Sequence, residues 1–367
     1  MLLIVVYIAS IGNTSVASTN TADDSRTIDS VYEITTRGDL KEPLDVDGRG
    51  SGGYPLKKTE VDLIGPCPPE EIVIFVHGWY LNENEAKERL DRVKMSLEHN
   101  DYNNISLVGY SWGSDIDWEP AKQVAKENGQ KLAQFIVKYV NACKTATLDG
   151  KQEIPTDIRL IGHSLGSRVI LSTLDSLHNN SMWNDDNTIN FNITSVHLLG
   201  AAVDNEEVSL ESIDKFNQPR SLHDPAGVKQ AYGPLIKDEV VNFYNMYNHE
   251  DNVFQFVYPN YEYLDDALGL TGKQQDNPIT LDDEEIPVSS NYLDVDVQPK
   301  INATDDSDGN GEVDLGMNIP GIPTDPQVGD NHGGYIGFRS TDRNNPFAGD
   351  GAMDVVVGHW RNDTSSN

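Results

Sequence analysis

Apolar and polar positions in this chain follow a pattern in which strands and helices alternate. Short, mostly apolar runs predict buried strands, and they lie at 72–79, 105–110, 158–161, 195–203 and 240–247. Apolar residues recur at helical spacing in the segments between them, over 82–100, over 119–142 and again after residue 164. Because a helix joins each strand to the next, right-handed crossovers are expected. The pattern therefore predicts an α/β fold with a doubly wound, mostly parallel sheet that carries helices on both faces.

The strand predicted at 158–161 runs into Gly162-His163-Ser164-Leu165-Gly166, which has the form G-x-S-x-G. A sharp turn at the serine lifts its hydroxyl above the sheet edge, and the flanking glycines carry no Cβ to collide with the joined elements. An oxyanion formed there would face backbone N–H groups and the positive end of the helix dipole. Ser164 is therefore the candidate nucleophile.

The apolar run at 72–79 ends in His77-Gly78-Trp79. Together with the turn at Ser164, this sequence resembles the α/β-hydrolase superfamily, in which His-Gly after the third strand shapes the oxyanion loop. The resemblance implies that the backbone N–H groups of Trp79 and Leu165 stabilise the oxyanion. It also implies that His77 holds its loop rather than acting as a base.

Further segments narrow the resemblance to the serine esterase or lipase-like hydrolases of halophilic archaea. These segments are Gly-Tyr-Ser-Trp, Gly-His-Ser-Leu-Gly-Ser-Arg, Leu-Leu-Gly-Ala-Ala-Val-Asp, Asn-Phe-Tyr and Asn-His-Gly-Gly-Tyr, and with His-Gly-Trp they fall within residues 55–340. The resemblance implies a fold and an order of catalytic residues, but no substrate.

Catalytic residues in this fold occur in the order serine, acid, histidine. Asp251 follows the strand at 240–247, where the superfamily usually carries its acid. Asp204 follows the preceding strand, where some lipases carry it, and it stays an alternative acid. Of the histidines after Asp251, His332 lies in a glycine-rich loop that suits a mobile base, whereas His359 follows an apolar run. The predicted triad is Ser164, Asp251 and His332.

These residues predict a serine hydrolase that cleaves a carboxylic ester through an acyl-enzyme, with a small-molecule or lipid ester as substrate. That chemistry requires no cofactor. An acyltransferase would use the same intermediate, and a non-catalytic binding protein could keep the same architecture, so both remain alternatives. The ordered triad argues against a binding protein, because such a protein has no reason to retain all three residues.

The charge of the chain adds a separate constraint. It has 59 acidic and 27 basic residues, a formal net charge of −32 and a pI near 4.4. So acidic a surface repels nucleic acid and anionic membranes, and neither is expected as a partner. In 1 M salt the self-repulsion is screened within about 3 Å. The composition therefore predicts a halophilic protein that depends on high salt and its cations.

The first 18 residues combine an apolar core with small residues at 16–18, which is typical of a signal peptide, and the core is too short for a stable membrane span. Residues 19–54 are predicted to be a flexible lead-in with one strand at 31–35. The hydrolase domain is expected over 55–360 and a tail over 361–367. Export is the expected localisation, with the cytoplasm of a halophile as the alternative.

An acidic, Pro/Gly-rich insertion at 299–330 precedes His332 and could form a lid or a metal loop. Within it, 306–314 matches the start of a calcium loop, with oxygen ligands at alternate positions and a glycine at the sixth. A structural calcium ion would be bound by Asp306, Asp308, Asn310, Glu312 and Asp314. Met317 stands where the twelfth-position acid is expected, so a chance match is the alternative.

The chain has two cysteines, Cys67 before the strand at 72–79 and Cys143 near the end of the helix at 119–142. In the fold that the chain resembles, this helix crosses back antiparallel to that strand. Both thiols would then lie at the end of the sheet opposite the active site. We expect a disulfide between them, which would fit an exported protein.

Overall fold

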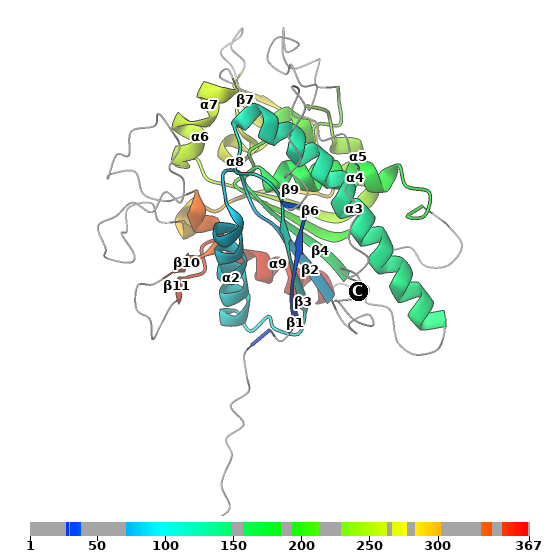
Figure 1. Ribbon diagram of the computed structural model, residues 1–367. Coiled ribbons are helices and arrows are strands. Elements are labelled where there is room, and N and C mark those ends of the chain that lie inside the picture. Colours follow the sequence, from blue (N-terminus) through cyan, green and yellow to red (C-terminus); the bar gives the residue numbers. More distant parts are fainter. Residues whose placement is uncertain are drawn as a thin grey trace, which may run out of the picture.

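The computed structural model describes residues 27–28, 30–37, 71–148, 157–184, 193–212, 229–262, 266–276, 283–301, 332–339 and 347–365. The centre of the protein is a seven-stranded sheet in the order β1-β3-β2-β4-β5-β6-β9, and all neighbouring strands in it are parallel (Figure 1). The strands are β1 (Ser30–Thr35), β2 (Glu71–Val76), β3 (Ser106–Ser111), β4 (Asp157–His163), β5 (Ile193–Leu199), β6 (Val240–Tyr247) and β9 (Tyr292–Asp296).

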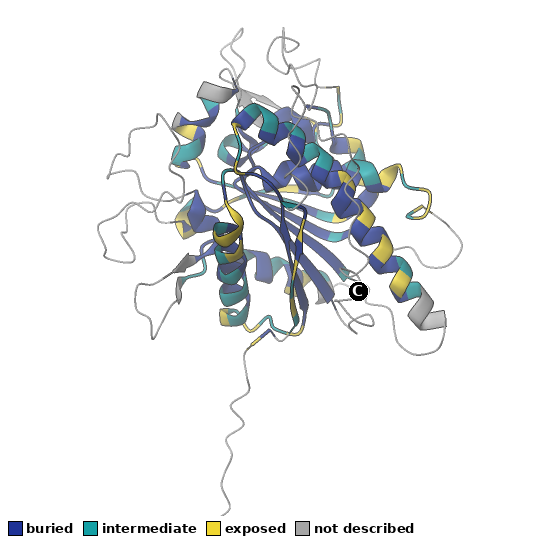
Figure 2. Cartoon of the chain, in the orientation of Figure 1, coloured by how far each residue is buried: buried dark blue, intermediate teal, exposed yellow. Residues whose placement is uncertain are grey.

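Helices cover both faces of this sheet (Figure 1). The longer ones are α2 (Glu83–His99), α3 (Trp118–Leu148), α4 (Gly166–His178), α5 (Gly233–Glu239) and α9 (Met353–Ser365). Successive residues of β2 point to opposite faces, so Ile72 and Ile74 pack with α3 and α4, whereas Val73 and Phe75 pack with α2 and α9. The central strands are therefore buried between two helical layers, as their dark colour in Figure 2 shows. This architecture confirms the predicted doubly wound α/β fold.

The remaining described elements are short. They are η2 (Asn205–Val208), α6 (Asn252–Phe256), α7 (Tyr258–Tyr261), α8 (Leu268–Thr271), β7 (Gln274–Asp276), β8 (Asp283–Glu285), η5 (Gln298–Lys300), η6 (Gly333–Ile336), β10 (Phe338–Arg339) and β11 (Phe347–Gly349). The pairs β7–β8 and β10–β11 are antiparallel. Two of these elements matter for the site, because α6 follows Asp251 and η6 follows His332.

The predicted strands and helices all have counterparts, including β1, which the pattern placed at 31–35. The start of α2 shows how local side chains fix the end of a predicted helix. Asn82 caps the helix by accepting from the backbone N–H of Asn84 at 2.9 Å and of Glu85 at 3.2 Å, while the Glu85 carboxylate accepts from the Asn82 N–H at 2.7 Å.

Helix α9 continues to Ser365, past residue 360, where the hydrolase domain was predicted to end. Two contacts with Arg159 hold the end of this helix. The Trp360 ring lies 5.3 Å from the guanidinium carbon, and the Asp363 carboxylate lies 3.4 Å from Nη1. Residues 361–365 are therefore helical rather than a tail.

Several segments with predicted roles lie outside the described residues. They are residues 1–18, most of 19–54 and all but the first residues of the insertion at 299–330. Within the described ranges, no helix combines the length and the apolar character needed to cross a membrane.

Cys143 is buried in α3 and is disulfide-bonded. Its predicted partner, Cys67, lies outside the described residues.

Closing the long loop between the two cysteines contributes roughly 4 kcal/mol in the chain-entropy model, so we expect Cys143→Ser to lower the free energy of unfolding by about that amount. When the unreduced protein is alkylated and analysed by mass spectrometry, both cysteines should be unmodified, because a disulfide has no free thiol to react. Two alkylated cysteines in the folded protein would contradict the predicted bond.

Candidate active site

Ser164 occupies the turn between β4 and α4 in a conformation that non-glycine residues rarely adopt. Its φ is +53°, and a strained backbone of this kind costs on the order of 1–3 kcal/mol. Hydrogen bonds hold the turn. The Ser164 N–H donates to the Leu199 carbonyl at 3.0 Å, and the Ser164 carbonyl accepts from the N–H groups of Ser167 at 3.0 Å and Ala202 at 3.2 Å. The strand beside the turn and the first turn of α4 therefore fix the strained serine.

Glycines allow three backbone segments to meet at this turn. A Cβ on Gly78 would lie 2.7 Å from the Cβ of Ser164, and a Cβ on Gly166 would lie 2.4 Å from the Val76 carbonyl oxygen. Neither approach is open to a residue with a side chain. The loop that follows β2 therefore lies directly against the nucleophile.

The two predicted oxyanion donors flank these contacts. Leu165 follows Ser164, and its backbone N–H makes no hydrogen bond within the part of the chain that is described. Trp79 follows Gly78, and its indole N–H donates to the Ile116 carbonyl at 2.7 Å, which fixes the side chain. Both residues thus stand next to Ser164, one on each side of it.

His77 holds the loop before Trp79. Its Nε2 accepts from the backbone N–H of Trp112 at 3.0 Å, and its Nδ1 donates to the Gly78 carbonyl at 2.9 Å. Burial, together with the nearby Arg37 guanidinium, lowers the pKa of His77 to about 3. A neutral ring with both nitrogens engaged cannot serve as the base, in line with its predicted structural role.

Asp251 and His332 meet, although 81 positions separate them in sequence. The His332 Nδ1 donates to the Asp251 Oδ2 at 2.8 Å, and both side chains are buried. The Asp251 Oδ1 caps α6 by accepting from the N–H groups of Val253 at 3.0 Å and Phe254 at 3.3 Å. Since Nδ1 carries the ring proton, the His332 Nε2 is free to accept one. It is buried and has no hydrogen-bond partner among the described residues.

His163, the residue before Ser164, ties the histidine loop to the nucleophile turn. Its Nε2 donates to the backbone carbonyl of His332 at 2.8 Å, and the two imidazole rings lie 5.0 Å apart. The place that a Cβ on Gly78 would take is 3.3 Å from the His163 Nδ1. Burial, followed by the charges of His332 and Arg89, lowers the pKa of His163 well below its ordinary value. A neutral His163 therefore bridges the loop after β2 and the loop of His332.

Tyr335 packs beneath the acid. Its hydroxyl donates to the Gly269 carbonyl at 3.3 Å, and the Asp251 carboxylate lies nearby. Burial, followed by that carboxylate, raises the pKa of Tyr335 well above its ordinary value, so it stays a donor. The ring fits because Gly200, at φ +54°, has no Cβ; one there would lie 2.7 Å from the Tyr335 Cε2.

The alternative acid, Asp204, is engaged elsewhere. Its Oδ2 pairs with the Lys229 ammonium at 2.5 Å, and its Oδ1 accepts from the Tyr258 hydroxyl at 2.7 Å. Burial alone would raise the pKa of Asp204, but Lys229 and these hydrogen bonds lower it overall. The alternative base, His359, lies in α9 and stacks on Tyr244 with ring centroids 4.1 Å apart. The described contacts join Asp251 to His332 and tie the His332 loop to His163, the residue before Ser164, whereas both alternatives make their described contacts elsewhere.

Asp204 belongs to a buried cluster of ion pairs beside the nucleophile turn. Arg168, in the first turn of α4, binds Glu207 through both terminal nitrogens at 2.6 and 2.9 Å. Lys229 and Lys122 both pair with Glu262, at 2.9 and 2.6 Å. These charges are almost completely buried, so each depends on its partner to offset the lost hydration.

A row of aromatic side chains joins the loop after β2 to the histidine. Trp79 contacts Trp118 edge-on at 4.9 Å, Trp118 contacts Tyr258 at 5.9 Å, Tyr258 contacts Phe254 at 5.7 Å and Phe254 contacts His332 at 4.8 Å. The polar tips are held, since the Trp118 indole donates to Glu262 and the Tyr258 hydroxyl to Asp204. The row thus begins at an oxyanion-loop residue and ends at the candidate base, with little freedom to move.

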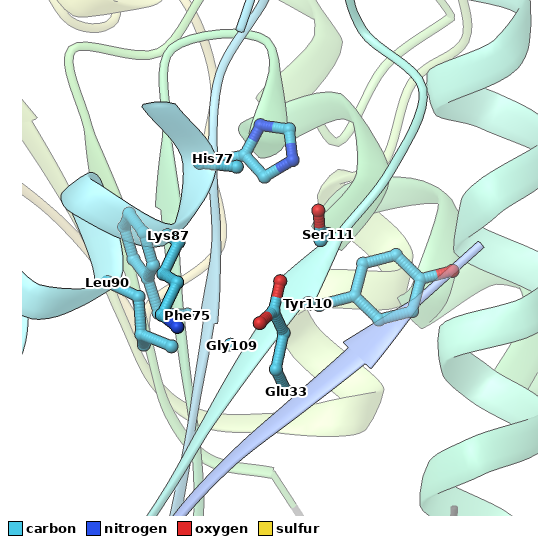
Figure 3. Close-up of a pocket in the computed structure, with 9 residues that line it drawn as sticks. Glu33, Phe75, His77, Lys87, Leu90, Gly109, Tyr110 and Ser111 are labelled. Carbon is cyan, nitrogen blue, oxygen red and sulfur yellow. The ribbon is translucent and has the colours of Figure 1, made fainter. Parts of the chain in front are cut away.

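A small pocket lies below His77 on the β3 side, bordered by Glu33, Lys87 and Ser111 (Figure 3). Its volume is about 10 Å³, which is enough for about one water molecule. It is therefore too small for an ester substrate.

The calcium ligands predicted at Asp306, Asp308, Asn310, Glu312 and Asp314 lie outside the described residues. Within the described ranges, no three histidine, cysteine or carboxylate side chains are grouped so that they could hold a metal ion.

Residues 64–224 match the protein family described as "Alpha/beta hydrolase of unknown function (DUF900)". That segment contains the loop after β2, the turn at Ser164 and four of the seven parallel strands. The chain has an α/β-hydrolase fold. No curated protein matches its sequence.

Solved structures similar to the chain include a lipase, an esterase and an arylesterase. Aspergillus fumigatus lipase B is 11% identical with a TM-score of 0.30, over 72% of this chain and 53% of that one. Esterase B from Lactobacillus Rhamnosis is 12% identical with a TM-score of 0.30, over 62% and 65% of the two chains. An arylesterase is 13% identical with a TM-score of 0.30, over 63% and 69%. The chain spans about half the length of the lipase.

Within this α/β-hydrolase fold, the sequence patterns missed two residues of the site, His163 and Tyr335. His163 occupies the variable second position of G-x-S-x-G, where the motif specifies no side chain. Tyr335 follows His332 by three residues, and its place in the Asn-His-Gly-Gly-Tyr segment was a usable signal. The buried charges of Arg168 and Glu207 were also missed, because periodicity assigns charged residues to solvent.

Proposed function

We propose that this protein is a serine hydrolase that cleaves carboxylic esters through an acyl-enzyme. The observation that carries the proposal is the buried hydrogen bond between His332 Nδ1 and Asp251, with the free His332 Nε2 on a loop that His163 ties to the strained Ser164. An orienting acid, a base with an available nitrogen and a nucleophile held on a strained turn are the parts that acyl transfer requires.

In the proposed reaction the Ser164 hydroxyl attacks the ester carbonyl carbon while its proton passes to the His332 Nε2. The carbonyl oxygen becomes an oxyanion and accepts hydrogen bonds from the backbone N–H groups of Leu165 and Trp79. When the C–O bond breaks, the His332 imidazolium gives its proton to the leaving alcohol. Water then attacks the acyl-serine by the same steps in reverse order and releases the acid. Asp251 stabilises the imidazolium in both halves.

Two alternatives differ from this proposal in observable ways. An acyltransferase would use the same acyl-serine but pass the acyl group to an alcohol rather than to water. A binding protein of the same fold would have no use for the strain at Ser164 or for the ordered pair behind it. The hydrolase is favoured because the chemistry needs no group beyond these side chains and water.

We further propose that the net charge of −32 adapts the protein to high salt and that it is exported.

A fluorophosphonate probe and a series of p-nitrophenyl esters of increasing acyl length, both used in molar KCl, test the proposal. We expect the wild type to be labelled and to release p-nitrophenol, with rates that rise from low to high salt because salt screens the self-repulsion. Ser164→Ala should abolish both signals, and Ser167→Ala, which changes another buried serine three residues on, should keep them. Labelling that persists in Ser164→Ala would refute the proposed nucleophile.

A further inference from the structure

Arg89, in the second turn of α2, is a buried cation without a hydrogen-bond or ion-pair partner among the residues that the structure describes. The residue is only 7% exposed to solvent. Its Nη1 is buried and donates to no hydrogen-bond acceptor among the described residues, and no ion pair joins the guanidinium to a carboxylate of those residues. A charge removed from water in this way is unfavourable unless something offsets it.

Three other buried cations of this protein have carboxylate partners. Arg168 is paired with Glu207, Arg159 with Glu71, and Lys122 with Glu262. The chain has 59 acidic residues for 27 basic ones, so carboxylates are abundant. An arginine that stays unpaired among the described residues of such a protein is therefore available to a group from outside them.

The position of Arg89 points to the active site. Helix α2 begins at Glu83, shortly after the oxyanion loop, so its first turns lie at the carboxyl edge of the sheet. Arg89 shares a helix face with Ser96, whose hydroxyl donates to the Ile336 carbonyl in η6 at 3.3 Å. Since Arg89 precedes Ser96 by seven residues, it lies about 10 Å closer to that edge, towards the start of η6, where His332 stands.

The electrostatic environment agrees with this placement. The charge of Arg89 contributes to the lowered pKa of His163, after burial and His332. His163 directly precedes Ser164 and donates to the His332 carbonyl. The field of the unpaired guanidinium therefore reaches the residues around the nucleophile.

We propose that Arg89 binds a negatively charged oxygen group of the substrate, a carboxylate or a phosphate, and that the protein acts on esters which carry such a group. This inference rests on the proposed esterase function. A guanidinium presents paired N–H donors that match either group. In a protein of net charge −32, one unpaired cation near the nucleophile would also offset the repulsion of an anionic substrate by the acidic surface.

A matched pair of substrates tests the inference: 4-nitrophenyl hexanoate, which is neutral, and mono-4-nitrophenyl adipate, which has the same acyl length and an added carboxylate. We expect Arg89→Met to lower kcat/KM for the adipate ester by about 10- to 100-fold, the range of a hydrogen bond to a charged group, and to leave the hexanoate ester within about twofold. Arg89→Lys should recover part of the loss. Lys94→Met, which removes a cation of the same helix that pairs with Glu98, should change neither ester.

Inhibition of hexanoate hydrolysis by free adipate and by butyl phosphate separates the two anion types, and the stronger inhibitor of the wild type should lose its effect in Arg89→Met. Equal losses of kcat/KM for both esters in Arg89→Met would overturn the inference. It would also be overturned if the wild type does not prefer the adipate ester and neither anion inhibits it through Arg89. If the wild type hydrolyses neither ester and is not labelled at Ser164, the esterase proposal has failed. Thermal shifts produced by adipate and butyl phosphate, compared between the wild type and Arg89→Met, then still decide whether Arg89 binds anions. The variant should fold, because it removes a buried charge that has no partner.

Discussion

Replacing Asp251 by asparagine should leave the protein folded and lower kcat on a p-nitrophenyl ester by roughly 10⁴-fold. Asp251 accepts the Nδ1 proton of His332 at 2.8 Å, and this bond keeps the free electron pair on Nε2. An amide in its place favours the other tautomer, in which Nε2 carries the proton and cannot act as a base. Ser164→Ala should be at least as severe, and the double variant little worse than Ser164→Ala alone, because the residues act as a unit.

Asp204→Asn is the matched control for this experiment. It removes one carboxylate charge from a buried site of the same kind, but its partners are Lys229 and Tyr258 rather than a histidine. We expect it to lower the free energy of unfolding or alter KM more than kcat. An inactive Asp204→Asn together with a nearly normal Asp251→Asn would move the acid to the end of β5. Full activity in both, with an inactive Ser164→Ala, would leave a serine–histidine dyad.

The second large effect concerns stability. Arg168→Met should lower the free energy of unfolding by about 3–5 kcal/mol, because it leaves the Glu207 carboxylate buried without its cation. That is a large share of the roughly 5–15 kcal/mol that stabilises a folded protein. Chemical denaturation in high salt measures the change, with the midpoint and the slope fitted separately.

The double variant Arg168→Met with Glu207→Leu is the control. It removes both charges and should recover much of the lost stability, since a buried ion pair contributes little beyond the cost of separating it. If Arg168→Met alone is as stable as the wild type, Glu207 does not depend on Arg168. If the double variant is as unstable as the single one, the two residues contribute through packing rather than through charge.

The layout of the sheet and its helices could be read from the sequence because it depends on periodicity. β2 is apolar from Ile72 to Val76 because both of its faces are covered, and α2 repeats Ala86, Leu90, Val93 and Leu97 on one side. The nucleophile turn was readable because its glycines are required by contacts within a few ångström of Ser164. Local rules of this kind act within a short stretch of chain, so the stretch itself contains the signal.

Side-chain pairing was not readable, because each pair joins segments that are distant in sequence. The choice between Asp251 and Asp204 depended on which carboxylate faces His332, and the contacts of Lys229 and Tyr258 with Asp204 have no counterpart in local pattern. The unpaired state of Arg89 among the described residues is likewise visible only in the folded structure. The extent of the last helix was missed for the same reason, since Arg159 from β4 holds its final turn.

The hydrogen bond from His163 to the His332 carbonyl has a consequence for when activity can arise. It joins positions 169 residues apart, and contacts of such separation form only after the intervening chain has been made and folded. The strained serine can be in place once β4, α4 and β5 exist, but its base arrives only when residue 332 has been synthesised. Under the proposed mechanism, a nascent chain would therefore be inert towards esters around it until synthesis has passed that point.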